Sequence, residues 1–325
     1  MKAAVRERFG PPESVVEVRE VDTPVPADDE VLVRVRAASI NIADWYSVTG
    51  RPWIARPQTG LRQPKSIRLG VDFAGTVEAV GKDVTQFRPG DDVFGGRDGA
   101  LAEYVCVREE RAVVPKPPDV TFEQAAAVPV AALTALQGLR DKGQLQPGQR
   151  VLINGASGGV GTFAVLVAKA LGAHVTGVCS TQNVETARSL GADRVIDYTS
   201  EDFTRSDERY DLMLDVAGSR SWSECKRVLR PEATVVLVGG PKSNRLLGPI
   251  GHVAAMRLGS MRGSRTTAFF VARFNKPDLE TLRELLGADK LTPAIDRSYP
   301  LSEIADALAY IGEGHARGKI VVTVD

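Results

Sequence analysis

The amino-acid sequence predicts an α/β protein, in which a doubly wound parallel sheet is joined to a domain of short β-strands. The chain has 325 residues, more than one ordinary hydrophobic core accommodates, so two domains are expected. Up to the Pro117-Pro118 pair, short valine-rich segments alternate with turn residues, which is typical of a barrel-like β domain. Beyond that pair, strand-like and helix-like segments alternate, which favours a parallel sheet.

The expected elements of the first part are strands. Valine-rich runs predict them at Val15–Val18, Glu30–Ala37, Gly75–Val80 and Glu103–Val107. Helical spacing of apolar residues then predicts one helix over Phe122–Leu139.

The second part alternates between the two kinds of element. Apolar runs predict strands at Arg150–Asn154, His174–Cys179, Arg194–Asp197, Tyr210–Asp215, Ala233–Val238 and Thr267–Val271. Helices are predicted at Gly159–Leu171, Asn183–Leu190, Glu201–Ser206, Ser221–Leu229, in an apolar region after Gly240, and at Asp278–Leu286. A last strand over Gly318–Val324 is expected to return the chain to the first domain.

Composition and charge narrow the function classes. Hydrophobic residues make up 43% of the chain and charged residues 25%, as in soluble globular proteins. Lys and Arg total 41, and so do Asp and Glu, so the basic excess of a nucleic-acid-binding or membrane-surface protein is absent. Three scattered cysteines and a first segment without a signal-type apolar run predict a cytoplasmic protein. The most apolar stretch, 125–139, is too short for a membrane span.

A glycine-rich turn carries the strongest functional signal. Residues 151–161, VLINGASGGVG, place an apolar strand directly before a glycine cluster and a helix. A helix N-terminus attracts an anion through its unpaired N–H groups and its dipole, and bare backbone lets a pyrophosphate approach. Ala156, Gly158 and Gly161 form an A-x-G-x-x-G variant of the dinucleotide fingerprint, so a dinucleotide site is predicted. The alternative is a plain tight turn in another kind of α/β protein.

The end of the next strand bears on which dinucleotide binds. An NAD enzyme usually carries Asp or Glu about 20 residues after the glycines, where it accepts from the ribose 2′-hydroxyl. Here residues 180–183 are Ser-Thr-Gln-Asn, with no acid before Glu185. Hydroxyl groups can donate to a 2′-phosphate, so NADP is expected, although no Arg or Lys stands at this strand end. Alternatively, Ser180 and Asn183 cap the following helix.

Motifs in both parts resemble the medium-chain dehydrogenase/reductase superfamily. The first part contains Asn41-Ile-Ala-Asp-Trp-Tyr46, GVDFAGTV (70–77) and RPGDDV (88–93). The second contains GASGGVGTFA (155–164), VCS (178–180), LGAD-x-VIDY (190–198), AFF (268–270) and GHARGK (314–319). The sequence is most similar to the quinone oxidoreductase branch and, within it, to reticulon-interacting proteins.

The resemblance covers essentially the whole chain and implies its organisation. Residues 1–120 and 272–325 would form a GroES-like β-barrel catalytic domain, and residues 121–271 a Rossmann domain that binds NADP. The active site would lie in the cleft between them. A homodimer is the assembly that the resemblance suggests, because dimers are common in the superfamily.

Two positions argue against zinc. Zinc-dependent alcohol dehydrogenases of the superfamily need a Cys, a His and a further ligand. The matching positions hold Asn41 and Val71, and an amide is a poor zinc ligand while Val has no donor atom. Without a Lewis acid an alcohol is not easily activated. The expected reaction is therefore hydride transfer from NADPH to a quinone or an α,β-unsaturated carbonyl, that is, an enone or enal.

Cofactor contacts follow from the turn and from the resemblance. Gly158, Gly161 and Asn183 come from the turn and the hydroxyl cluster. The resemblance adds Thr134 near the nicotinamide, with helix packing as the alternative, and also Ser157, Gly159, Val160, Ser180, Tyr198, Phe270, Ala272, His315, Ala316 and Arg317. Two departures stand out: relatives often carry Arg or Lys near Gln182, and they carry Asn at the position of Val216.

Tyr46 and Asn41 are the candidate catalytic residues. Tyr46 would donate a proton to the substrate oxygen; the alternatives are a proton from water and an ordinary half-buried Tyr. Asn41 would orient the substrate or simply hold its loop by hydrogen bonds. Asp44 is expected to cap a turn, and Asp72 to be a buried structural acid without a role in proton transfer.

Two further expectations concern basic residues. Arg317 and Lys319 are expected to end a helix before the last strand, where basic residues favour the helix C-terminus in any case. The segment 51–68 holds three prolines and four arginines and is long for a connector, so it either shapes the substrate cleft or forms a solvated loop.

The sequence thus predicts a zinc-independent NADPH oxidoreductase acting on a small-molecule quinone, enone or enal. The alternative is an NADPH-binding sensor or interaction protein with little turnover.

Overall fold

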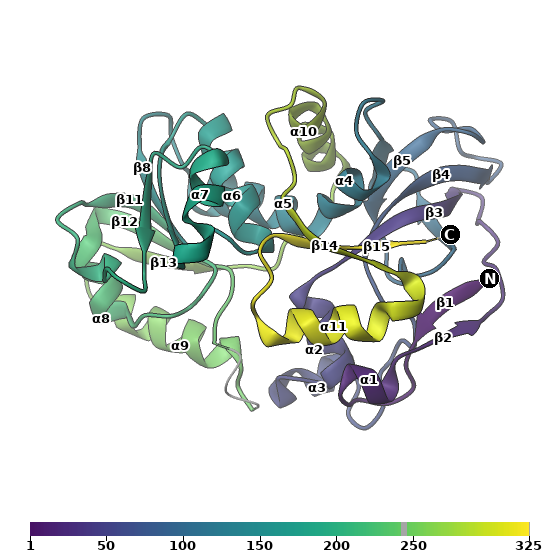
Figure 1. The fold of residues 1–325 in the computed structure, drawn as a ribbon, viewed down its shortest axis with the longest axis horizontal. Coiled ribbons are helices and arrows are strands. Elements are labelled where there is room, and N and C mark those ends of the chain that lie inside the picture. The colour runs from purple at the N-terminus through teal and green to yellow at the C-terminus, as the bar shows by residue number, and fades with distance from the viewer. Residues whose placement is uncertain (242–245, 325) are drawn as a thin grey trace. The chain divides into compact units, whose positions relative to one another are not determined.

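The computed structural model describes residues 1–241 and 246–324. They form two compact units (Figure 1): unit 1 comprises Met1–Leu133 and Arg273–Asp325, and unit 2 comprises Thr134–Ala272. The predicted domain boundaries after residues 120 and 271 stay a prediction, because a compact unit need not coincide with a domain that folds on its own.

Unit 2 is built on a six-stranded parallel sheet with the order β10-β9-β8-β11-β12-β13. Its strands are β8 (Arg150–Asn154), β9 (His174–Cys179), β10 (Arg194–Asp197), β11 (Tyr210–Asp215), β12 (Leu229–Leu237) and β13 (Thr266–Phe269). The order reverses between β8 and β11, since later strands add on either side of β8. Ligands of such sheets bind outside the carboxyl ends of the strands at this switch point.

Helices connect the strands of unit 2. The α-helices are α6 (Gly159–Ala170), α7 (Val184–Ser189), α8 (Trp222–Cys225) and α9 (Pro249–Ser260). The π-helical turn η2 (Gln137–Lys142) and the 3-10 turns η3 (Thr181–Asn183), η4 (Phe203–Arg205) and η5 (Lys226–Val228) lie between other elements. Helix α6 packs against β8 and β9, α7 against β9 and β10, and α9 against β13 and α8. The predicted doubly wound parallel sheet is confirmed.

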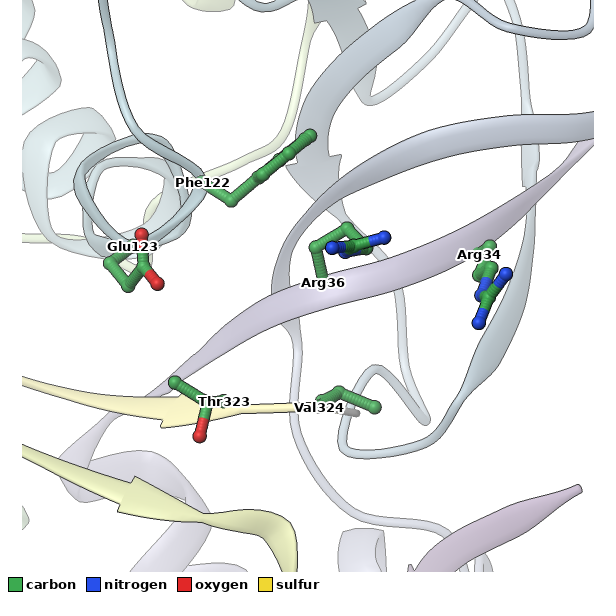
Figure 2. Close-up of a pocket in the computed structure, with 6 residues that line it drawn as sticks. All are labelled: Arg34, Arg36, Phe122, Glu123, Thr323 and Val324. Carbon is green, nitrogen blue, oxygen red and sulfur yellow. The ribbon is translucent and has the colours of Figure 1, made fainter.

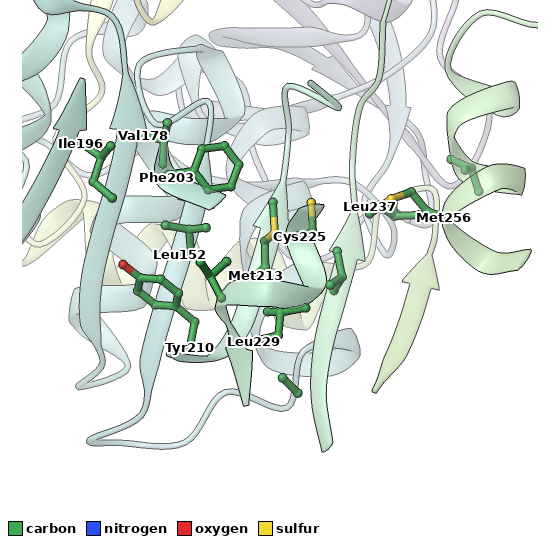
Figure 3. Close-up of a cluster of buried hydrophobic side chains, with 14 residues drawn as sticks. Leu152, Val178, Ile196, Phe203, Tyr210, Met213, Cys225, Leu229, Leu237 and Met256 are labelled. Carbon is green, nitrogen blue, oxygen red and sulfur yellow. The ribbon is translucent and has the colours of Figure 1, made fainter. Parts of the chain in front are cut away.

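The core of unit 2 explains why its central strands are continuous apolar runs. Figure 3 shows Leu152, Tyr210 and Met213 from neighbouring strands packed together with Phe203 and Cys225. A parallel strand covered on both faces buries every residue, as β8 does from Val151 to Asn154. Burial of a Val or Leu side chain contributes about 1.5–3 kcal/mol, so these strands anchor the turns that follow them.

Unit 1 holds a seven-stranded, mostly antiparallel sheet with the order β14-β15-β3-β4-β5-β7, and β6 pairs with β3. Its strands are β3 (Glu30–Ile40), β4 (Asp72–Val80), β5 (Asp92–Gly96), β6 (Tyr104–Arg108), β7 (Val113–Pro115), β14 (Ile295–Pro300) and β15 (Lys319–Thr323). Strands β1 (Lys2–Val5) and β2 (Glu17–Glu20) form a separate pair. The predicted β-rich part is confirmed, and β15 brings the C-terminal segment against β3.

The helices of unit 1 are mostly short. They are α1 (Pro12–Val15), α2 (Ile42–Thr49), η1 (Trp53–Ala55), α3 (Arg56–Thr59), α4 (Phe122–Ala127), α10 (Lys276–Gly287), η6 (Leu301–Glu303) and α11 (Ile304–Glu313), and α5 (Pro129–Leu136) carries the chain into unit 2. Helix α4 packs on β3, β4 and β15, and α11 packs on α2. The segment 51–68 is thus not wholly irregular.

Among the predicted elements that were wrong in detail, three differ most. The helix predicted over Phe122–Leu139 is divided into α4, α5 and the π-helical turn η2, because Pro129 lacks the N–H that a continuous helix requires. The helix predicted at Glu201–Ser206 is only the 3-10 turn η4. In that segment only Phe203 and Thr204 are buried, so it lacks an apolar face for a longer helix. The strand predicted at Val15–Val18 begins later, as β2, after the turn α1.

The region after Gly240 contains α9, as predicted, and residues 242–245 lie outside the described part of the chain. Across the residues that the structure does describe, no helix combines the length and the apolar character needed to cross a bilayer.

Candidate functional site

The glycine-rich turn lies between β8 and α6. Gly155 has a φ of 94°, which favours glycine, and its N–H and that of Ala156 both donate to the carbonyl of Val178 in β9. Ala156 in turn packs so closely on Gly177 that a Cβ there would lie 3.0 Å from the Ala156 methyl. Small residues therefore tie the turn to the neighbouring strand.

The two later glycines of the motif have different reasons to be glycine. A Cβ on Gly161 would lie 1.9 Å from the carbonyl oxygen of Gly155, so close packing excludes any side chain. A Cβ on Gly158 would meet nothing nearer than that same oxygen, at 3.8 Å. The space beside Gly158 is free of protein atoms, as a site for a pyrophosphate requires.

Helix α6 begins at Gly159 with its N–H groups available to an anion. Gly158 is the N-cap and no side chain caps this end. Ser157, Gly158, Gly159 and Val160 are all half-buried, and Gly161 is buried. Uncapped N–H groups and the positive end of the helix dipole make this terminus suited to a phosphate.

The adenosine-side residues meet at the carboxyl ends of β9 and β10. The N–H of Tyr198 donates to the carbonyl of Cys179 at 3.0 Å, which places Tyr198 next to Ser180. Asn183 is buried and its amide donates to the Ser180 hydroxyl oxygen at 3.0 Å. Ser180 and Asn183 occupy the N-cap positions of η3 and α7, as the capping alternative requires, but neither makes a side-chain capping bond.

Sequence reasoning missed Asp197 at this strand end. Its carboxylate accepts from the hydroxyl of Thr181 at 2.6 Å and from the N–H and hydroxyl of Thr199 at 2.9 and 2.8 Å. The Thr181 hydroxyl, followed by the other Thr bonds, lowers the pKa of this carboxyl from its ordinary value. Asp197 is the last residue of β10, and only the pairing of β10 with β9 brings it next to the end of β9. The residues that directly follow β9 in the sequence therefore do not indicate it.

A second missed group lies at the switch point between β8 and β11. The carboxylate of Asp215 is fully buried and accepts from the Asn154 amide at 2.8 Å, from the N–H of Gly218 at 2.9 Å, and pairs with His252 Nε2 at 3.2 Å. The available signal was that two adjacent apolar strands, β8 and β11, both end in a polar residue. These bonds hold the two strand ends and α9 together beside the turn. Val216 follows Asp215, and its N–H donates to the Asn154 carbonyl.

The remaining predicted cofactor residues of unit 2 lie at its ends. Phe270 and Ala272 follow β13 and are half-buried, at the same edge of the parallel sheet as the turn. Phe270 faces η2, since a Cβ on Gly138 would lie 3.4 Å from its ring. Thr134 lies in α5 and is half-buried.

His315, Ala316 and Arg317 belong to unit 1, in the loop after α11. His315 and Arg317 are exposed, and the Arg317 N–H donates to Asp296 at 3.0 Å. The expectation that Arg317 and Lys319 end a helix was wrong. Helix α11 stops at Glu313 because Gly314 adopts a left-handed φ of 86°, and Lys319 is a buried residue of β15.

Unit 1 contains a buried polar network around Asp72, the first residue of β4. One carboxylate oxygen of Asp72 accepts from Ser39 at 2.9 Å, from the Asn41 amide at 2.9 Å and from Lys319 at 3.3 Å. The other oxygen accepts from the N–H of Val130 at 3.0 Å. Lys319 also donates to the amide oxygen of Asn41 at 2.7 Å. Asp72 thus has four donors, which suits the expected role of a structural carboxylate.

Asp44 and Tyr46 lie in α2, directly after Asn41. The Asp44 carboxylate accepts from the N–H of Asn41 at 2.7 Å, which closes the N-terminus of the helix as expected. Burial raises the pKa of Asp44 to about 7, and that N–H opposes the shift. Tyr46 is half-buried; burial raises its pKa, and its hydroxyl has no hydrogen-bond partner among the residues described. It is therefore a neutral hydroxyl with an available proton.

The structure also bears on the fit of zinc to unit 1. Both ends of the Asn41 side chain are already hydrogen-bonded, to Lys319 and to Asp72. Val71 offers no ligand atom, and an ammonium within 3 Å of Asn41 opposes a second cation there. The described residues contain no group of three or more His, Cys, Asp or Glu able to hold a metal ion. The residues at these positions do not fit a zinc site.

A pocket of about 290 Å³ in unit 1 is lined by Arg34, Arg36, Phe122, Glu123, Thr323 and Val324 (Figure 2). None of the predicted site residues lines it. Arg34 and Arg36 project from the same face of β3, as residues two apart on a strand do. It is distinct from the glycine-rich turn, which lies in unit 2.

Comparison with known proteins agrees with this arrangement. Residues 27–118 match the family model of the alcohol dehydrogenase GroES-like domain, and residues 190–322 match that of a zinc-binding dehydrogenase. The mitochondrial NAD(P)H oxidoreductase RTN4IP1 of Mus musculus is 37% identical, over 91% of this chain and 82% of that protein. The trans-enoyl reductase pgmF of Aspergillus terreus is 34% identical, over 91% of this chain and 87% of that protein.

Among solved structures, the quinone oxidoreductase from Coxiella burnetii superimposes with a TM-score of 0.85. It is 31% identical, and the match covers 100% of this chain and 99% of that one. The predicted combination of a GroES-like domain with a Rossmann domain is confirmed. With 37% identity across most of both chains, this protein belongs to the medium-chain dehydrogenase/reductase family and resembles its quinone oxidoreductases.

Proposed function

We propose that this protein is a zinc-independent NADPH oxidoreductase that transfers a hydride to a quinone or an α,β-unsaturated carbonyl. The observation that carries the proposal is the turn from Gly155 to Gly161. It presents the uncapped N-terminus of α6, with free space beside Gly158, at the carboxyl edge of a parallel sheet. The names of the relatives point the same way, because they are NAD(P)H, quinone and enoyl oxidoreductases.

The cofactor would be held by both backbone and side chains. The N–H groups of Gly159, Val160 and Gly161, with the Ser157 hydroxyl, would bind the pyrophosphate. Ser180, Asn183 and Tyr198 would contact the adenosine end, and Thr134, Phe270 and Ala272 the remaining parts of the dinucleotide. His315, Ala316 and Arg317 complete the proposed set. When bound, the reduced nicotinamide supplies the hydride.

The preference for NADPH over NADH depends on the ends of β9 and β10. Ser180 offers its hydroxyl proton to a 2′-phosphate, since its oxygen already accepts from Asn183. Thr181, by contrast, is bound to Asp197, whose negative charge opposes a phosphate. We therefore propose NADPH as the cofactor, with a modest preference.

The substrate class follows from the residues in unit 1. Asn41 and Val71 do not fit zinc, so an alcohol would lack the Lewis acid that lowers its pKa. A quinone or conjugated carbonyl needs no such activation, because hydride adds to a carbon that is already electrophilic. The electrons move to the carbonyl oxygen, which takes a proton from Tyr46 or from water. NADPH and one proton are consumed, and NADP⁺ and the reduced acceptor are formed.

The test is a turnover assay with a panel of acceptors. Purified protein is mixed with NADPH or NADH and with quinones, enones, enals and simple alcohols, and nicotinamide absorbance is followed. We expect NADPH oxidation with quinones or enones and no NADP⁺ reduction by alcohols. Tight NADPH binding without turnover on any acceptor would overturn the proposal and support the alternative, an NADPH sensor or interaction protein.

Two coarser expectations accompany this proposal. A homodimer is proposed from the family, and sedimentation equilibrium of the purified protein measures it. A cytoplasmic location is proposed from the sequence, whereas the Mus musculus relative is named as mitochondrial. Imaging of the tagged chain in its own cell distinguishes the two.

A further inference from the structure

The orientation of the Asn41 amide is fixed by the chemistry of its neighbours. Lys319 Nζ is only a donor, so the Asn41 atom 2.7 Å from it is the amide oxygen. The Asp72 carboxylate is only an acceptor, so the atom 2.9 Å from it is the amide nitrogen. Oxygen and nitrogen of an amide are otherwise hard to tell apart. Here a flipped amide would place its nitrogen, a donor, beside the Lys319 donor and its oxygen, an acceptor, beside the Asp72 acceptor.

This orientation leaves one N–H of Asn41 unused. The amide nitrogen carries two protons, and one of them is donated to Asp72. The other has no partner among the residues that the structure describes, and Asn41 is half-buried rather than enclosed. The side chain therefore offers a single neutral donor of fixed direction, next in sequence to the helix that carries Tyr46.

Lys319 and Asp72 cannot serve as such donors themselves. Their side chains are 2% and 0% exposed, and the hydrogen bonds of Asp72 are taken up by Ser39, Asn41, Lys319 and Val130. Of their contacts, those with Asn41 bear on the direction of its free N–H. The buried charges also balance, because one ammonium faces one carboxylate and burial favours the neutral form of the nearby Asp44.

We propose that Asn41 donates its free N–H to the oxygen of the hydride acceptor, and that Lys319 and Asp72 are positioning residues that hold the amide in this orientation. The inference rests on the proposed function. As hydride adds to the conjugated carbon, an electron pair moves to the carbonyl oxygen, and a hydrogen bond aimed at that oxygen lowers the barrier. A flipped amide would present its own oxygen there and repel the developing charge. The proton that completes the reduction comes from Tyr46 or water.

A double-mutant cycle tests the positioning role. Asn41→Ala removes the donor, and Lys319→Met removes the group that orients it. Each is expected to lower kcat by about hundred- to thousandfold, as loss of one preorganised donor does, with the Kd of NADPH unchanged. The double variant is expected to be no slower than Asn41→Ala, because Lys319 acts through Asn41. Independent, multiplying losses would overturn the proposal.

Two further variants separate orientation from folding. Lys319→Met/Asp72→Asn removes both charges, so no unpaired carboxylate stays buried, and its kcat is expected to stay low although it folds. Recovery of wild-type kcat in this variant would contradict the proposal. Lys116→Met is the matched control, because Lys116 is also a buried lysine of unit 1, with its side chain 6% exposed and bound to the Val120 carbonyl at 2.7 Å. It is expected to change the melting temperature but not kcat.

Failure of the proposed Asn41 orientation can be distinguished from failure of the proposed function. If none of the acceptors in the panel supports NADPH oxidation by the wild-type protein, the proposed function is wrong. The orientation of the Asn41 amide can still be measured in that case, by hydrogen exchange of its side-chain protons in solution NMR. One protected and one unprotected proton support the assigned orientation. Equal exchange of the two protons, or no change on Lys319→Met, would overturn it.

Discussion

At the scale of single residues, burial of Asp44 at the start of α2 makes the free energy of unfolding depend on pH. Its side chain is 5% exposed, and the pKa near 7 means that the folded protein keeps a proton that the unfolded chain releases at about pH 4. Between these values the unfolded state binds fewer protons, so the free energy of unfolding decreases as pH rises. The slope attributable to one such group is at most about 1.4 kcal/mol per pH unit.

The variant Asp44→Asn tests this. An Asn at 44 can still accept from the Asn41 N–H but does not titrate, so the variant is expected to lose less stability than the wild type between pH 5 and 7. Urea unfolding at both pH values measures the difference. The exposed Asp207→Asn is the control and is expected to keep the wild-type pH dependence. Identical pH dependence in Asp44→Asn would show that the carboxyl is ionised throughout.

We expect Asp197 to influence the choice between NADPH and NADH. Its charge lies beside Thr181 and Ser180, where the 2′-phosphate of NADPH is proposed to bind. Asp197→Asn is expected to raise the affinity for NADPH relative to NADH by about two- to fivefold, since an exposed charge acts through water. Fluorescence titration with both cofactors measures the ratio.

The control for this prediction lies at the other end of the same strand. Asp193 precedes β10 and pairs with Lys169 at 2.8 Å, at the amino edge of the sheet. Asp193→Asn is expected to leave the NADPH/NADH ratio unchanged. If both variants shift the ratio equally, the effect is one of net charge and not of this site.

At the scale of elements, two glycines of the glycine-rich turn allow its packing and its cofactor binding to be tested separately. Gly158→Ala keeps a permitted φ of −82° and meets no protein atom closer than 3.8 Å, so it is expected to fold normally and to bind NADPH roughly tenfold or more weakly. Gly161→Ala would place a methyl 1.9 Å from a backbone oxygen, and the shift it forces is expected to cost about 1–3 kcal/mol of stability. Thermal unfolding and NADPH titration of both variants measure the contrast. Equal loss of stability in both would show that the space beside Gly158 is not open.

Prediction of elements succeeded where burial dominates. Strands β8, β9, β10 and β11 have the predicted bounds. For β8, β9 and β11 the reason is that a parallel strand buried on both faces is a nearly continuous apolar run. It failed for Glu201–Ser206 and for the end of α11. In the first segment only one apolar residue, Phe203, is buried, and in the second a left-handed glycine, Gly314, ends the helix. Short strands such as β7 carry too few residues for a pattern.

At the scale of the whole molecule, we expect the reaction to be independent of bound metal. Dialysis against a strong chelator is expected to leave kcat with a quinone or enone unchanged, and metal analysis of the active protein to find less than one zinc per chain. The reason is the commitment of Asn41 to Lys319 and Asp72 and the lack of a ligand atom on Val71. Loss of activity on dialysis with recovery on added zinc would contradict this prediction.

The sequence alone determined the dinucleotide turn and the absence of zinc ligands at positions 41 and 71, because both depend on residue types within short, contiguous segments. The tertiary structure decided which groups surround the site residues, with Lys319 and Asp72 beside Asn41 and Asp197 beside Thr181. Lys319 is 278 residues from Asn41 and 247 from Asp72, and they meet only because β15 and β4 both pair with β3. A buried charge is stable only with its partner, and hydrophobic periodicity carries no information on which distant strand supplies it.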